Sequence, residues 1–119
     1  MTPKMGYKFL KTWGRTPYSG NDFSRFLPRG NKKGKWLPNV NPDISPLKLC
    51  ARGYHYCRTK SDIISWIRGR IIKEINVFRI EIHEKAKILN GPDKSCASQI
   101  RFLKKLKVRR DRHGRIKLV

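Results

Sequence analysis

The chain has 119 residues, with 29 lysines and arginines against 8 aspartates and glutamates, which gives a formal net charge of +21. This length predicts a single domain, and the 12 aromatic residues among clusters of aliphatic ones exclude full disorder. No apolar run reaches the roughly 18 residues of a membrane-spanning helix, and residues 1–6 lack the apolar stretch of a signal peptide. The three cysteines, an odd number, predict no disulfide framework. We therefore expect a cytoplasmic protein without a membrane partner.

The surplus of cations is the main clue to function. A net charge of magnitude up to about 8 is enough to keep a small domain in solution, whereas +21 makes a compact chain repel itself and attract anions. Phosphate backbones release condensed counterions when lysine and arginine neutralise them. The charge therefore predicts nucleic acid or a nucleoprotein complex as the partner, with an acidic protein surface as the alternative.

The first third of the chain reads as one strand followed by a long loop. Residues 7–13 nearly alternate apolar and polar side chains, which is typical of a strand. Glycines and prolines then recur every few residues from Gly14 to Pro46, which excludes a long helix. The loop also carries four aromatic side chains, Tyr18, Phe23, Phe26 and Trp36, and four cations between residues 28 and 36.

The middle of the chain is the most apolar part and is expected to hold the core. Residues 47–50 and 53–57 read as short strands. The spacing of isoleucines predicts a helix over residues 60–71, with Thr59 or Ser61 as its N-cap. Residues 75–83 are rich in β-branched side chains that alternate with polar ones, which predicts a strand.

The last third is the most basic. Apolar residues three apart in residues 95–107 favour a helix, while residues 99–103 can instead form a strand. Residues 107–119 predict either a basic β-hairpin or a disordered arm that follows a basic domain over residues 1–106. The expected class is α+β, with a small antiparallel or mixed sheet, one or two helices and a loop-rich N-terminal third.

Two clusters of cations are the candidate nucleic-acid-binding site. Lysine and arginine contact phosphates, and an indole in a loop can stack on an unpaired base, so RNA is preferred over duplex DNA. A core position for the indole is the alternative. The candidate residues are Arg29, Lys32, Lys33, Lys35 and Trp36 in the loop, and Arg101, Lys104, Lys105, Lys107, Arg109, Arg110, Arg112 and Arg115 near the end.

Metal binding and catalysis have weaker support. Cys50, His55 and Cys57 group together, but six residues separate the two cysteines, which does not match the short paired spacing of zinc sites. Carboxylates are scarce, and no nucleophile elbow, P-loop or dinucleotide fingerprint is present. We therefore predict no metal, no cofactor and no catalytic residues, and favour a binding protein over an enzyme.

Part of the chain resembles small bacteriophage and prophage proteins of uncharacterised activity. Residues 49–57 are similar to their C-x-x-G-[YF]-H-x-C segment, and residues 93–100 to their D-K-S-x-x-S-x-I stretch. Residues 34–38 also resemble some members. The resemblance implies a phage or mobile-element origin and a host-cell cytoplasm. It makes an inhibitor of a host defence nucleoprotein complex an alternative function.

A fainter likeness is to the ADP-ribosyltransferase fold. A strand with Tyr7, a G-[YF]-x-[FY] strand followed by a helix, and a later strand with Glu81 occur in a similar order. That family uses NAD and carries a histidine or arginine on its first strand, which residues 7–9 do not supply. The likeness implies an NAD-dependent enzyme as a further alternative, in which Glu81 and Tyr56 would act.

Overall fold

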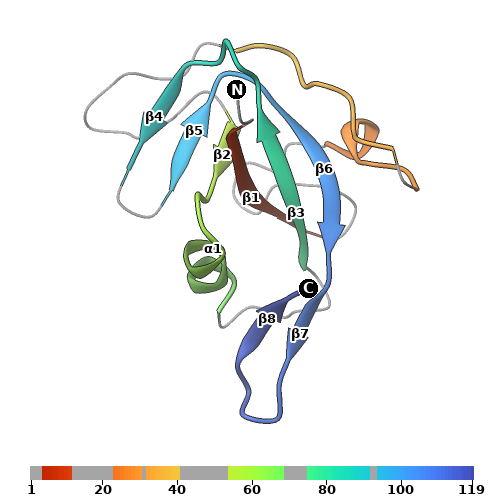
Figure 1. Ribbon diagram of the computed structural model, residues 1–119, viewed down its shortest axis with the longest axis vertical. Coiled ribbons are helices and arrows are strands. Elements are labelled where there is room, and N and C mark those ends of the chain that lie inside the picture. Colours follow the sequence, from red (N-terminus) through yellow and green to blue (C-terminus); the bar gives the residue numbers. More distant parts are fainter. Residues whose placement is uncertain (1–3, 12–22, 31, 41–53, 69–74, 92–93) are drawn as a thin grey trace.

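The computed structural model describes residues 4–11, 23–30, 32–40, 54–68, 75–91 and 94–119 (Figure 1). Within these ranges the chain forms antiparallel β-sheets and a single α-helix, which confirms the predicted α+β class. None of the helices in the described ranges is long and apolar enough to span a membrane.

The central element is a three-stranded antiparallel sheet. It consists of β1 (Lys4–Lys11), β3 (Ile75–Ile82) and β6 (Ile100–Leu106), with β3 in the middle. Side chains of β3 point alternately to the two faces, and five of its eight residues are buried. Both faces of the sheet are therefore packed near the start of β3, while Arg79, further along, is exposed.

A second sheet continues the same chain segments. β4 (Ile88–Asn90) and β5 (Ser95–Ala97) extend the hairpin formed by β3 and β6, and β2 (Tyr54–Tyr56) pairs with β5. Cys57, directly after β2, exchanges two backbone hydrogen bonds of 2.7 and 2.8 Å with Tyr7 of β1. The two sheets are thus joined on one side by the continuous hairpin and on the other by this bridge (Figure 1).

The space between the two sheets holds the first hydrophobic cluster. Phe102 lies at its centre and contacts Phe23 and Phe78, with ring centroids 6.0 and 5.2 Å away. Other members come from both sheets and from the loop: Leu10, Leu37, Tyr54, Tyr56, Ile80, Ile82, Ala97 and Ile100. This cluster ties the loop-rich first third of the chain to the strands.

A second cluster covers the opposite face of the central sheet. Helix α1 (Lys60–Ile67) contributes Ile63 and Ile67, which pack on side chains of β1, β3 and β6. The C-terminal hairpin of β7 (Val108–Arg110) and β8 (Ile116–Leu118) joins the same cluster through the buried Leu118. Residues 107–119 therefore form a hairpin anchored to the core, which decides between the two alternatives left open by the sequence.

Helix α1 begins where the sequence predicts. Thr59 is the N-cap, and its Oγ1 accepts a hydrogen bond of 3.1 Å from the backbone N–H of Asp62. The carboxylate of Asp62 stands in the first turn, where it suits the positive end of the helix dipole. The helix ends at Ile67, and residues 69–71 of the predicted range lie outside the described residues.

The strand expected over residues 7–13 is shifted. β1 begins three residues earlier, at Lys4, and ends at Lys11, because its register is set by full pairing with β3. Residues 12 and 13, and the short strand expected over residues 47–50, lie outside the described residues.

The loop that carries Arg29, Lys32, Lys33 and Lys35, called here the basic loop, runs along the edge of β6 that does not pair with β3. Backbone N–H groups of Gly34, Leu37 and Val40 donate to the carbonyl oxygens of Phe102, Ile100 and Ser98, at 2.7 to 3.0 Å. Before this stretch a 3₁₀ turn, η2 (Ser24–Phe26), places Phe23 in the first cluster. The edge of the sheet is therefore covered by an extended segment over residues 33–40.

The helix favoured over residues 95–107 is wrong, since this segment forms β5 and β6. Ile100, Leu103 and Leu106 are three residues apart, which fits one face of a helix. In the structure Ile100 and Phe102 are buried, and a bulge between Phe102 and Lys104 shifts the alternation so that Leu106 is buried too. Pairing with β3, distant in the sequence, decides the outcome.

Candidate nucleic-acid interface

Residues 107–119 form a projecting, strongly basic structure, called here the basic hairpin. Figure 1 shows β7 and β8 extending from the body at the end opposite β4 and β5. Its cations are all exposed and make no salt bridge with any described residue. They are Lys107, Arg109, Arg110, Arg112, Arg115 and Lys117.

The single acidic residue of the basic hairpin is used to build its turn. Oδ1 of Asp111 accepts hydrogen bonds of 2.8 and 2.9 Å from the backbone N–H groups of His113 and Arg115. Gly114 adopts a φ of +77°, which an L side chain rarely tolerates. The carboxylate thus shapes the loop that presents the arginines.

Like charges face each other across the basic hairpin. Arg109 and Lys117 are direct cross-strand partners, and both are exposed. Such a pair destabilises a two-stranded ribbon unless an anion screens it. Lys104 and Lys105, at the end of β6, add two more exposed cations next to the root of the hairpin.

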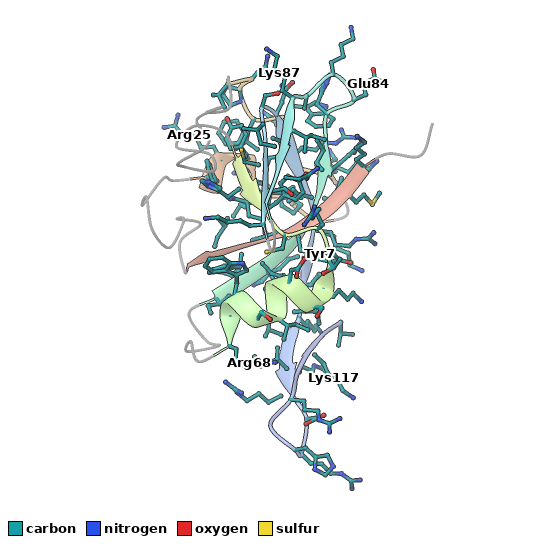
Figure 2. All side chains as sticks on the ribbon, turned by 90° about the vertical axis from the view of Figure 1, so that its left-hand side faces the viewer. Tyr7, Arg25, Arg68, Glu84, Lys87 and Lys117 are labelled. Atoms are coloured by element: carbon teal, nitrogen blue, oxygen red, sulfur yellow. The ribbon has the colours of Figure 1, made fainter. Side chains whose placement is uncertain are left out.

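The cations of the basic loop belong to a segment that is hydrogen-bonded to the edge of β6. Arg29, Lys32, Lys33 and Lys35 are exposed, and a turn from Arg29 to Lys32 is closed by a backbone hydrogen bond of 3.0 Å. Figure 2 places Arg25, close to this loop in sequence, far from Lys117 of the basic hairpin. The two predicted clusters nevertheless meet along β6, where the Gly34 N–H of the loop donates to the Phe102 carbonyl oxygen.

Trp36 and Arg101, both predicted site residues, contact each other. The guanidinium of Arg101 lies over the Trp36 ring, 4.4 Å from its centroid, and the His83 ring packs at 4.9 Å from that centroid. Nε and Nη2 of Arg101 donate to Oε1 of Glu81 at 2.9 and 2.6 Å. Trp36 is half-buried in this stack, so it has a structural role whatever else it binds.

We expect Glu81→Gln to lower the free energy of unfolding by about 1–2 kcal/mol. The substitution leaves Arg101, which is 23% exposed, without its carboxylate partner, and charge-assisted hydrogen bonds of this kind exceed neutral ones in strength. Urea denaturation measures the loss. Glu84→Gln removes the same charge from an exposed position and is the control; equal losses in both variants would show that the pair itself contributes nothing.

Sequence reasoning missed two cations. Arg79 on β3 is exposed and pairs in register with Lys104 of β6, and its Nη2 lies 3.1 Å from Sδ of Met5. The strand pattern alone gives no sign that these two cations lie side by side, because the register across strands is needed. The other missed cation is Lys8, which is buried.

Lys8 points from β1 into the first cluster. Its Nζ donates a hydrogen bond of 2.5 Å to the His55 carbonyl and lies 5.7 Å from the Phe23 ring centroid. Burial lowers the pKa of Lys8 from its ordinary 10.5 to about 8, and the charge of Cys57 opposes this only in part. Burial therefore destabilises the ammonium form, which still predominates below about pH 8.

Two buried tyrosines stand in the same cluster. Burial raises the pKa of Tyr54, whose hydroxyl donates to the Pro38 carbonyl at 2.7 Å. Burial also raises the pKa of Tyr56, while a hydrogen bond with Ser95 and the charge of Arg58 act in the opposite direction. Tyr56 faces this cluster whereas Glu81 lies on the outer face of β3, so the two residues implied by the ADP-ribosyltransferase likeness point to different faces.

The cysteines differ in state. Cys57 is buried in the second cluster and is not part of a disulfide. Cys96 is disulfide-bonded, which the sequence did not lead us to predict. Within the described part of the chain no three His, Cys, Asp or Glu side chains group as a metal site. Cys50 lies outside the described residues.

Comparison with protein-family models, curated proteins and solved structures finds no match to this chain. The resemblances to phage proteins and to ADP-ribosyltransferases stay predictions from the sequence motifs.

Proposed function

We propose that the protein binds nucleic acid through contacts between its exposed cations and the phosphate backbone. The observation that carries this proposal is the basic hairpin. Six exposed cations stand on a projecting ribbon whose single carboxylate is engaged by backbone N–H groups. The repulsion among these cations is relieved when a dense row of negative groups lies against the ribbon.

The ligand class follows from charge density. Duplex DNA carries one negative charge per roughly 1.7 Å of its axis, and each phosphate that a cation neutralises releases condensed counterions. Side chains of lysine and arginine on a rigid ribbon reach several phosphates at once. The RNA preference expected from the aromatic loop rests on Trp36, whose ring packs against Arg101, and on Tyr18, which lies outside the described residues.

The proposal predicts a steep salt dependence. With about six phosphate contacts, the affinity for a labelled oligonucleotide of about 20 nucleotides or base pairs is expected to fall by roughly three orders of magnitude between about 50 and 200 mM salt. Fluorescence anisotropy titrations at several salt concentrations measure the slope.

The control ligand is poly-glutamate, which has a similar number of charges but no phosphate. Equal affinity for poly-glutamate would favour the alternative partner, an acidic protein surface. Affinity for the oligonucleotide that does not change over this range of salt would reject phosphate-backbone binding.

A further inference from the structure

The basic hairpin has the shape of a short ribbon. Each strand has three residues, about 10 Å at 3.4 Å per residue, and its partner strand lies about 4.8 Å away. The major groove of B-form DNA is about 12 Å wide and 8.5 Å deep, and it admits a two-stranded β-ribbon. The dimensions of the hairpin thus match this groove.

Its cations point in several directions. Arg109 and Lys117 stand on one face, and Arg112 and Arg115 lie in the turn. Arg110 shares the other face with Val108, Ile116 and Leu118, which pack on the second cluster. A groove surrounds an inserted ribbon with phosphates on both walls and base edges at the floor. Cations on the exposed face and at the tip can meet one wall and the floor of such a groove, whereas a flat surface would meet the cations of the exposed face alone.

The ribbon is fixed at its root before any ligand binds. Lys107 and Val119 exchange two backbone hydrogen bonds of 2.9 and 3.0 Å, and Leu118 is buried in the second cluster. Val108 and Ile116 pack against that cluster as well. Because the ribbon is ordered in the free protein, binding costs little conformational entropy.

The composition of the hairpin argues against single-stranded nucleic acid as the ligand of this site. Residues 107–119 contain no phenylalanine, tyrosine or tryptophan, so that His113 is the one aromatic ring of the hairpin on which a single-stranded base can stack. The major groove of A-form RNA is too deep and narrow for side chains to read. Of the common nucleic acids, B-form DNA is the one whose groove accepts this ribbon.

We propose that the basic hairpin enters the major groove of duplex DNA, with Arg112 and Arg115 at the base edges and the remaining cations on the phosphates. The proposal rests on the proposed function and narrows its ligand to one class. Arginine at the floor of the groove can donate to guanine O6 and N7.

The test compares four labelled ligands of one sequence: duplex DNA, duplex RNA, single-stranded DNA and single-stranded RNA. We expect duplex DNA to bind at least about tenfold more tightly than each of the others. Bound protein is expected to protect guanine N7, which faces the major groove, from dimethyl sulfate.

The two matched variants each remove two charges, one pair from the turn of the basic hairpin and one pair from outside the predicted site. Arg112→Gln with Arg115→Gln is expected to weaken duplex DNA binding by about tenfold or more and to remove the preference for it. Lys85→Gln with Lys87→Gln removes the same charge from exposed positions outside both predicted clusters. It is expected to leave the preference in place. Thermal melting shows that both variants are folded.

The outcomes separate the inference from the function on which it rests. Equal binding of all four ligands, a preference for RNA, or unprotected guanine N7 would overturn groove insertion while leaving phosphate binding intact. No binding to any of the four at low salt would overturn the proposed function itself.

Discussion

Replacing Gly34 with alanine is expected to lower the free energy of unfolding by about 3 kcal/mol. A Cβ at this position would meet two backbone carbonyl oxygens, those of Phe26 and Phe102, and the second lies only 2.9 Å away. The Gly34 N–H also donates to the Phe102 oxygen at 2.7 Å, so the loop cannot move away without losing that bond. A backbone atom cannot rotate away as a side chain can, so the steric clash of the added methyl group is not easily relieved.

The control is Gly114→Ala in the turn of the basic hairpin. Nothing lies within 4 Å of the added methyl group there, but φ is +77°, so the cost is conformational and amounts to about 1 kcal/mol. Urea denaturation of both variants measures the difference. A loss at Gly34 no larger than at Gly114 would mean that the loop shifts freely along β6 and does not fix the edge of the sheet.

The local sequence pattern predicts a helix or strand correctly when each of its faces lies in a single environment, either the core or solvent. Residues 75–83 alternate regularly, and β3 forms over almost that range. The helix at residues 60–67 combines a cap with an apolar face, and both are found. β4 has no such pattern: Ile88 and Leu89 are half-buried, Asn90 is exposed, and the strand depends on pairing with β5. The sequence therefore gives no local sign of it.

The candidate site is likewise predicted only in part by the local sequence. The density of cations after residue 100 predicts an exposed basic surface, because so many like charges cannot be packed inside. The choice between a hairpin and a disordered arm depends on Leu118, which is buried by α1 and the central sheet. That contact joins segments about 50 residues apart, and the local sequence does not reveal it.

Lys8 is the clearest failure of local reasoning. Because side chains alternate along β1, Lys8 lies on the other face from Phe9, and a polar side chain there is expected to contact solvent. The second sheet and Phe23 cover that face, so the lysine is 7% exposed. A cation on a strand is assigned to the surface by default, and only the closing of the two sheets shows otherwise.

Lys8→Met is expected to raise the free energy of unfolding by about 2 kcal/mol at pH 7. Because the pKa of Lys8 falls from 10.5 in the unfolded chain to about 8 in the folded one, the unfolded chain binds more protons between these values. Stability therefore rises with pH across this window, and the full penalty is present below pH 8. Methionine removes the buried charge, at the loss of one hydrogen bond to the His55 carbonyl.

The pH dependence tests the cause directly. Between pH 7 and 9.5 the stability of the unmodified protein is expected to rise by about 2 kcal/mol relative to Lys8→Met, so that the two converge. Above pH 10 the raised pKa values of Tyr54 and Tyr56 act in the opposite sense, since the unfolded chain then loses protons that the folded one keeps. Measurements of unfolding in urea are therefore best confined to the lower window.

Lys4→Met provides the matched control, because Lys4 stands on the same strand but is exposed. It removes the same formal charge from a protein of net charge +21, so any general relief of repulsion appears in both variants. If the stability difference between Lys8→Met and Lys4→Met does not change with pH, the buried ammonium is not the cause of the lower stability of the unmodified protein. Convergence as the pH rises would place the cost in the desolvated charge, since losing the proton removes that charge and leaves the packing unchanged.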